Sequence, residues 1–265
     1  MFSGCENITN IGKIINARPN YMNAMFNWCA RLRYLPEFVN LNLSGMHGWG
    51  NANFSSMFYY CFSLREIPED FLKELYGATT RTSYTLFSAG FDHCYCLDEI
   101  RGLNPKTGAI TSNAFYNTFQ YCYRLKNVIF ATQDNGTPYT ATLSNQTIDL
   151  TNYLGYAHNT NNILNYNSGI TADKEVIDDT TYQALKNNPD WFTTKVEYSR
   201  YNHDSAVNTI NSLPDTSAFL ATNGGTNTIS FKGAAGSATD GGAINTLTEE
   251  EIAVATAKGW TVSLS

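Results

Sequence analysis

Charged side chains are scarce in this sequence, and basic ones are not clustered. Charged residues make up 15% of the 265 residues and hydrophobic ones 43%, a composition too apolar for a disordered chain. The formal net charge is −6, and no Lys/Arg cluster exists that would neutralise a row of phosphates or hold an anionic bilayer. We therefore expect no nucleic-acid partner. The polar surface should consist mainly of amide and hydroxyl groups, which suit neutral partners such as glycans.

Long apolar runs are also missing. No stretch approaches the roughly 20 apolar residues that a membrane-spanning helix requires. The start, Met1 to Glu6, lacks the basic and apolar regions of a secretory signal. We therefore expect neither membrane insertion nor export directed by these residues.

Cysteine is infrequent, but its positions are regular. Five segments place an aromatic residue, a cysteine and two more apolar residues at successive intervals of three. They are Phe2, Cys5, Ile8 and Ile11; Phe26, Cys29, Leu32 and Leu35; Phe58, Cys61, Leu64 and Ile67; Phe91, Cys94, Leu97 and Ile100; and Phe119, Cys122, Leu125 and Val128. In the last four segments a large apolar residue also stands four positions before the phenylalanine, the spacing of one helical turn: Met22, Phe54, Phe87 and Phe115. Each segment is expected to form a short helical turn, a tight corner at the cysteine and a short strand.

The segments are expected to stack on one another. Each buries only about five apolar side chains, worth about 1.5–3 kcal/mol apiece, which cannot order an isolated segment. Variable insertions separate the segments, as is typical of repeat architectures. Stacking would make a continuous cysteine column, so we expect reduced, buried thiols; a framework of disulfides is the alternative.

Two segments end in proline, Pro36 and Pro68, and these rings are expected to stop strand continuation. The pattern Met-Phe-x-x-Cys-x-x-Leu-x-x-Ile-Pro, seen in Met25 to Pro36 and Met57 to Pro68, resembles the BspA-like class of leucine-rich repeats. That class occurs in surface proteins of gut bacteria and in virion proteins of their phages. The resemblance covers residues 1 to about 130. It implies adhesion or receptor recognition, without catalytic residues.

The expected fold is an α/β repeat, a leucine-rich-repeat solenoid of short helical turns and short strands, with a small C-terminal α/β segment. The solenoid is expected over residues 1–170, with clear repeats over 1–130 and degenerate ones over 131–170. Within the degenerate part, residues 148–150 and 163–164 suggest further strands.

Residues 171–265 are expected to form a segment that caps or mounts the solenoid. Its patterns predict helices over 173–187 and 205–213 and strands over 195–201 and 228–231. Thr248 and the three glutamates after it predict a capped helix that Gly259 ends, followed by a strand over 260–264.

Two groups of chemically active side chains are expected to have structural roles rather than catalytic or metal-binding ones. Asp92, His93, Cys94 and Cys96 lack a second ligand group at metal spacing, so no metal site is expected. His203, Asp204 and Ser205 are the residue types of a hydrolytic triad, but sequence neighbours cannot adopt its geometry. We expect a turn there with Asp204 or Ser205 as helix N-cap. No phosphate-binding glycine loop is present, and no cofactor is expected.

Tyrosines that flank the core positions are the candidate binding residues: Tyr59, Tyr60, Tyr95, Tyr116, Tyr121 and Tyr123. Facing outward in rows, they would offer stacking faces for sugar rings. The alternative is that they cover neighbouring repeats.

The favoured function is a non-enzymatic recognition or structural module of a phage virion appendage, such as a tail fibre, that contacts the bacterial surface. Its partners would be other virion proteins or copies of itself, and a surface glycan or protein receptor. A bacterial cell-surface adhesin of the BspA-like class is the alternative. Third is a carbohydrate-active enzyme, which would need two facing carboxylates about 5–9 Å apart. Glu66, Glu69 and Asp70 cluster in the sequence without an evident facing partner.

Overall fold

The structure is a computed structural model. It describes residues 1–42, 54–72, 87–94, 96–104, 114–120, 122, 125, 127–150, 203–231 and 247–264. The helix expected over 173–187 and the strands expected over 163–164 and 195–201 lie outside these residues. Among the helices that are described, none is long and apolar enough to cross a membrane.

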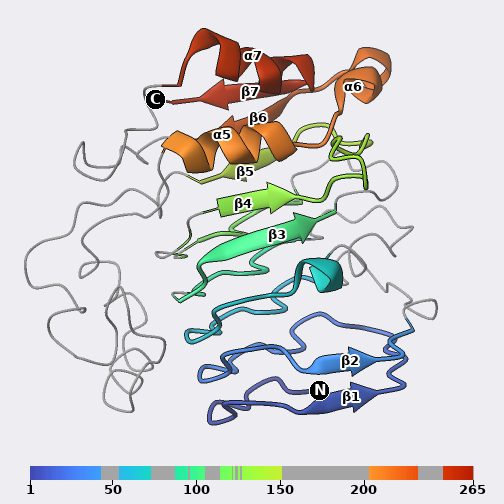
Figure 1. The fold of residues 1–265 in the computed structure, drawn as a ribbon, viewed down its shortest axis with the longest axis vertical. Helices are drawn as coiled ribbons and strands as arrows, with labels where there is room; N and C mark the ends of the chain where they lie inside the picture. Colours follow the sequence, from blue (N-terminus) through green and yellow to red (C-terminus); the bar gives the residue numbers. More distant parts are fainter. Residues whose placement is uncertain are drawn as a thin grey trace, which may run out of the picture.

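Short parallel strands line one side of the molecule (Figure 1). β1 (Lys13–Ile15) pairs with β2 (Glu37–Val39), and β3 (Glu99–Leu103) pairs with β4 (Asn127–Phe130). Between these two sheets, an isolated parallel bridge joins Tyr34 to Glu66. Equivalent parts of successive sequence copies therefore lie side by side in the order of the chain.

The segments before the cysteines are successions of tight turns. The prediction that they form helical turns is therefore wrong. The N–H of Cys29 donates to the carbonyl of Phe26, three residues back, and positive φ angles recur just before the cysteines. In the second to fourth copies the positive-φ residues are Ala24 and Trp28, Ser56 and Tyr60, and Ala89 and His93; Gly4 and Asn117 have positive φ at matching positions of the first and fifth copies. Apolar residues four apart share a face in this geometry as they do in a helix. The spacing therefore identified the buried side chains but not the backbone conformation.

This backbone forms a ladder between copies. The N–H groups of Phe26 and Trp28 donate to the carbonyls of Met57 and Tyr59, and those of Phe58 and Tyr60 donate to the carbonyls of Gly90 and Asp92. Every second N–H is thus satisfied by the next copy, so that the turn segments are paired although they are not regular strands.

The columns expected from the sequence form the core. The rings of Phe2, Phe26, Phe58, Phe91 and Phe119 stack in succession, with centroids 5.6–6.2 Å apart. The leucine three residues after the cysteine is fully buried in each of the last four copies: Leu32, Leu64, Leu97 and Leu125. The predicted inward face of the repeat is therefore confirmed at these positions. Pro36 was expected to end a strand, but it stands immediately before β2. Because proline lacks an N–H, this position outside β2 costs the strand no hydrogen-bond donor.

The C-terminal residues add a three-stranded parallel sheet in the order β5 (Thr147–Asp149), β6 (Asn227–Ser230) and β7 (Trp260–Ser263). The helices are α5 (His203–Ser212), α6 (Ser217–Asn223) and α7 (Glu249–Ala257). The capping box between Thr248 and Glu251 is confirmed. α5 begins at His203, so Asp204 and Ser205 lie in its first turn and the N-cap role expected for them is wrong. α6 was not expected.

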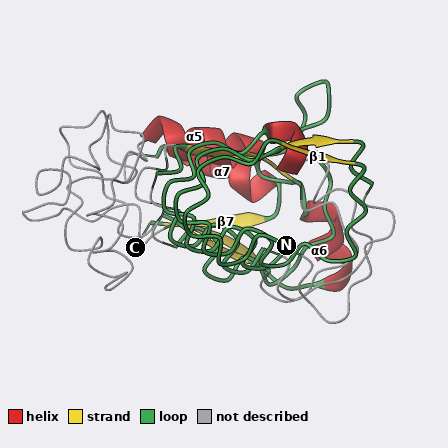
Figure 2. Ribbon diagram, turned by 90° about the horizontal axis from the view of Figure 1, so that it is seen from below, coloured by secondary structure: helices red, strands yellow, loops and turns green. Residues whose placement is uncertain are grey.

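Helix α5 covers the outer edge of β4 (Figure 1). The Thr209 hydroxyl donates to the carbonyl of Val128 at 2.8 Å, and the Ser212 hydroxyl accepts from the N–H of Phe130 at 3.0 Å. Two backbone groups of the edge strand are thereby satisfied by side chains, which prevents further strand pairing there. Figure 2, which looks along the stack, shows β1 and α5 on one side of the molecule and β7 on the other.

Candidate binding surfaces

A second row of stacked rings lies beside the phenylalanine column. Tyr60 stacks between Trp28, at a centroid distance of 4.2 Å, and His93, at 4.1 Å. All three residues precede a cysteine and have positive φ, which turns their side chains the same way. Tyr60 was a candidate from the sequence, whereas its two neighbours in the row were not. The available signal was the planar residue directly before the cysteine in these three copies.

The row corrects the binding role expected for Tyr60. Trp28 and His93 cover its two ring faces, so neither face can accept a sugar. Tyr59 is half-buried and packs edge-on against Tyr60, with ring centroids 4.3 Å apart. These two tyrosines cover neighbouring copies, the alternative that the sequence left open. Tyr116 is 62% exposed and retains an accessible ring. Tyr95, Tyr121 and Tyr123 lie outside the described residues.

Asp92 and His93 form a buried pair at the last described residue of this row. The His93 Nδ1 lies 2.5 Å from the Asp92 Oδ1. Burial raises the pKa of the Asp92 carboxyl, and the contact with His93 only partly opposes that effect. The neighbouring Cys94 thiol donates to the Phe58 carbonyl at 3.1 Å and so belongs to the core column. In the part of the chain that the structure describes, no group of three or more potential metal ligands occurs.

The cysteine thiols connect successive copies. Cys29, Cys61, Cys94 and Cys122 each donate a hydrogen bond of 3.0–3.1 Å to the carbonyl of the phenylalanine in the preceding copy: Phe2, Phe26, Phe58 and Phe91. All four thiols are unpaired and buried. Burial raises the pKa of the Cys29 thiol to about 12, and it also raises the pKa values of the Cys61, Cys94 and Cys122 thiols well above the ordinary range.

We expect Cys29, Cys61, Cys94 and Cys122 to resist thiol reagents in the native protein. The thiolate is the reactive form, and both the raised pKa values and the burial suppress it. Titration with a chromogenic disulfide should label these residues only after denaturant is added, with mass spectrometry assigning each site. Cys5, which is only partly buried, is the internal control for reagent access. Rapid labelling of Cys61 and Cys94 without denaturant would contradict the stacking.

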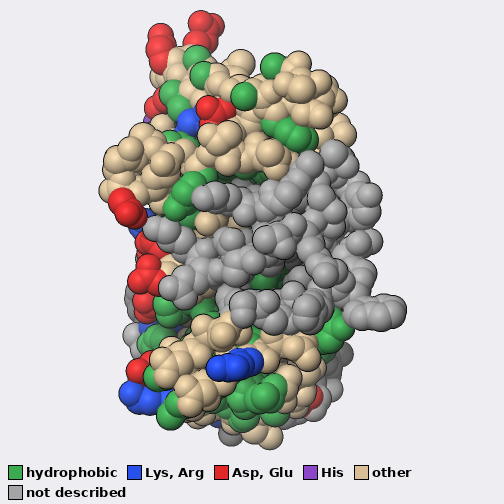
Figure 3. Space-filling view, turned by 90° about the vertical axis from the view of Figure 1, so that its right-hand side faces the viewer, with side chains coloured by type: hydrophobic (Ala, Val, Ile, Leu, Met, Phe, Trp, Pro, Cys, Tyr) green, Lys and Arg blue, Asp and Glu red, His purple; other side chains and the backbone are tan. Residues whose placement is uncertain are grey.

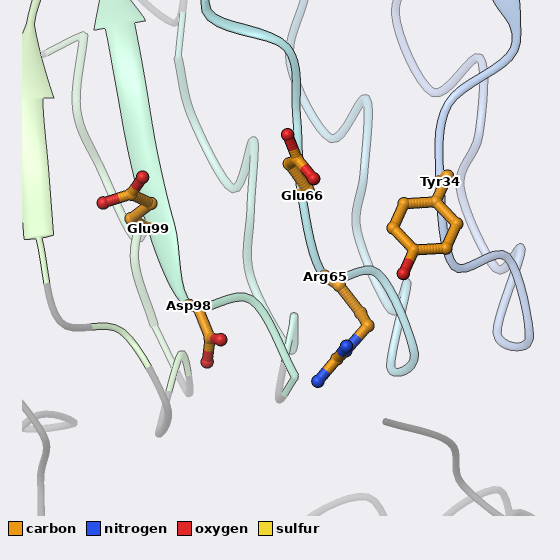
Figure 4. Close-up of a pocket in the computed structure, with 5 residues that line it drawn as sticks. All are labelled: Tyr34, Arg65, Glu66, Asp98 and Glu99. Atoms are coloured by element: carbon orange, nitrogen blue, oxygen red, sulfur yellow. The ribbon is translucent and has the colours of Figure 1, made fainter. Parts of the chain in front are cut away.

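A polar groove of about 320 Å³ opens on the strand side of the molecule, lined by Tyr34, Arg65, Glu66, Asp98 and Glu99. Figure 4 shows the Arg65 and Asp98 side chains extending in one direction and those of Glu66 and Glu99 in the other. The Asp98 N–H donates a hydrogen bond to the Arg65 carbonyl at 3.4 Å. The lining residues therefore come from equivalent positions in three successive copies.

The groove lies where the parallel sheet is interrupted. After Pro68, residues 69–72 are helical and do not continue the pairing of β2, although Phe71 still stacks on Phe38 at 5.0 Å. Proline followed by acidic residues is a frequent helix start. The chain approaches β3 closely at this point. A Cβ added to Gly102 would lie only 2.5 Å from the Glu69 carbonyl oxygen. At the groove, the strand pairing between these two copies is therefore reduced to the single bridge between Tyr34 and Glu66.

Among the described residues, three carboxylates and one guanidinium line the groove, so this part of its lining is acidic. The Arg101 Nε donates to Glu99 at 2.8 Å, and this hydrogen bond raises the pKa of Arg101. Among the described residues, the Glu66 carboxylate has no hydrogen-bond or ion-pair partner. Figure 3 shows acidic side chains following one edge of the molecule. The groove can therefore offer hydrogen-bond acceptors to a ligand that carries donors.

These carboxylates do not resemble the acid and base of a glycosidase. A general acid needs an environment that favours its protonated form, whereas Glu99 is ion-paired with Arg101 and Glu66 is exposed. Glu69 and Asp70, considered from the sequence, are exposed and do not line the groove.

Comparison of the chain with protein family models, with curated proteins and with solved structures gives no match. Its function must therefore be inferred from the residues and their geometry.

Proposed function

We propose that the chain is a non-enzymatic recognition module of the leucine-rich-repeat kind, carried on a phage virion appendage that contacts the bacterial surface. The observation that supports this best is the side-by-side placement of equivalent residues from successive copies, which builds the groove from three of them. In this proposal the stacked copies are turns of a solenoid, and the C-terminal helices and strands cap or mount it.

Such a module acts through contact rather than chemistry. An open polar groove and a partly exposed aromatic side chain give weak individual contacts. Multiple copies of the chain on one particle would convert weak contacts into stable attachment, because later contacts form at high effective concentration. The partners would be a bacterial surface glycan or protein receptor, and other virion proteins or further copies of the chain.

Adsorption to cells tests this proposal. Fluorescently labelled protein, both as purified and clustered on beads, would be mixed with a panel of gut bacteria and sedimented. We expect the clustered form to sediment with some strains at least about 100-fold more strongly than the unclustered form, as avidity allows. Heat-denatured protein on the same beads is the control. Failure of clustered native protein to adsorb to any strain would contradict the proposal.

The alternative of a bacterial adhesin requires a separate measurement, since adsorption alone suits both proteins. Mass spectrometry of purified virions and of bacterial surface fractions would locate the chain. Peptides of the chain in density-purified virions support the appendage, and peptides confined to the bacterial surface support the adhesin.

A further inference from the structure

We propose that the groove lined by Tyr34, Arg65, Glu66, Asp98 and Glu99 is a saccharide subsite that prefers an amine-bearing sugar to an acidic one. The inference rests on the proposed function and adds to it a place and a ligand class. Its support is the combination of a concave shape, an accessible aromatic ring and an excess of acceptor groups.

The shape of the groove suits a small part of a longer ligand. About 320 Å³ is at the lower end of the range of ligand pockets, so the groove would hold one or two sugar units. It is an open groove rather than an enclosed cavity, which leaves room for the rest of a chain to continue past it. Weak single-site affinity follows from this limited enclosure.

Tyr34 supplies the apolar contact. Its side chain is 46% exposed, in contrast to Tyr60, whose faces are covered by Trp28 and His93. The C–H groups of a pyranose ring can pack on an exposed tyrosine face, and the phenol can hydrogen-bond at its polar end. The backbone bridge between Tyr34 and Glu66 places the two residues side by side on neighbouring copies, and both line the groove.

The charges select the kind of sugar. Glu66 can accept hydrogen bonds from hydroxyl and ammonium groups, whereas Arg65, Asp98 and Glu99 line the same groove but already have interactions of their own. Glu99 already accepts from Arg101, so Glu66 is the carboxylate best placed to bind an ammonium group. A uronic acid or a sulfated sugar would bring another negative charge to a groove that has a net negative charge, and would be disfavoured.

Titration with three short oligosaccharides of equal length tests the subsite: a glucosamine oligomer, its N-acetylated counterpart and a galacturonate oligomer. Binding to the full chain would be followed by calorimetry or by ligand-observed NMR. We expect the glucosamine oligomer to bind most tightly and the galacturonate oligomer least. Raising the salt concentration should weaken the first interaction, because its charges are solvent-exposed.

Two variants locate the interaction. Glu66→Gln should lower the affinity for the glucosamine oligomer about tenfold, the usual effect of removing a charged hydrogen-bond partner, and Tyr34→Ala should lower affinity for both amino sugars. The matched control is Glu37→Gln, a glutamate in β2 outside the groove whose carboxylate pairs with Lys13 at 2.7 Å. It should leave all three affinities unchanged. Circular dichroism would verify that each variant is folded.

Absence of binding by all three oligosaccharides would overturn the subsite, as would unchanged affinity in folded Glu66→Gln or a preference for galacturonate. These failures are distinguishable from failure of the proposed function. Wild-type protein that still adsorbs to cells would keep its recognition role and lose only this ligand and place. Protein that fails to adsorb to any strain would lose the proposed function itself.

Discussion

Replacing Phe58 with alanine is expected to lower the free energy of unfolding by about 3–5 kcal/mol. Phe58 is fully buried, and its ring stacks between Phe26 at 5.7 Å and Phe91 at 5.6 Å. Truncation would leave a cavity in the middle of the column, and the copies on either side cannot close it because backbone hydrogen bonds fix their separation. Chemical denaturation followed by tryptophan fluorescence would measure the loss.

Tyr116→Ala is the matched control for Phe58, because it removes an aromatic ring that is 62% exposed. It should change the free energy of unfolding by less than about 0.5 kcal/mol, as surface substitutions usually do. Equal losses at Phe58 and Tyr116 would show that the phenylalanine column does not carry the stability assigned to it.

Leu64→Ala is expected to destabilise the protein by about 2–5 kcal/mol. Leu64 is fully buried, three residues after Cys61 in the same copy. Glu66→Ala, two residues further on, removes an exposed side chain without a partner among the described residues and should cost less than about 0.5 kcal/mol. The pair tests which residues of this copy face inward.

Unfolding midpoints in urea would compare the two variants, since the slopes should be similar if both retain the native fold. A loss at Glu66 as large as that at Leu64 would contradict the inward face assigned to this copy. It would also weaken the assignment of Glu66 to an open groove.

The sequence predicted the buried columns because hydrophobic spacing reports directly on which side chains share a face. It could not predict the backbone between them. Non-glycine residues such as Trp28 and Ala24 rarely adopt positive φ, so nothing in their identity indicates the repeated turn. The spacing of Met22 and Phe26 fits both a helix and this turn, so the spacing alone does not distinguish the two conformations.

The missed elements of the C-terminal residues have a similar cause. α6 has no buried residue, so its sequence shows no apolar stripe for a pattern to detect. β5 lies where the sequence predicted a strand over 148–150, but its parallel pairing with β6, which is distant in the chain, leaves no local trace. By contrast, the capping box of α7 was predicted correctly, because it depends on neighbouring residues alone.

The exposure of the tyrosines and the position of the groove could not be predicted from the sequence. Tyrosine is amphipathic, so its identity does not reveal whether a ring is covered, as in Tyr60, or partly exposed, as in Tyr34. The groove was not expected at all, since its residues come from three copies separated by insertions of different lengths. Equivalent positions such as Arg65 and Asp98 carry opposite charges, which hides their common location.

We propose that this chain binds a bacterial surface without altering it. The most direct measurement combines adsorption and chemistry in one tube: clustered protein is incubated with a strain that adsorbs it, and released carbohydrate is analysed by mass spectrometry and reducing-end assay. We predict stable adsorption with no release above that of heat-denatured protein. Sustained release of oligosaccharides by native protein, abolished by replacing a pair of its carboxylates, would contradict the claim.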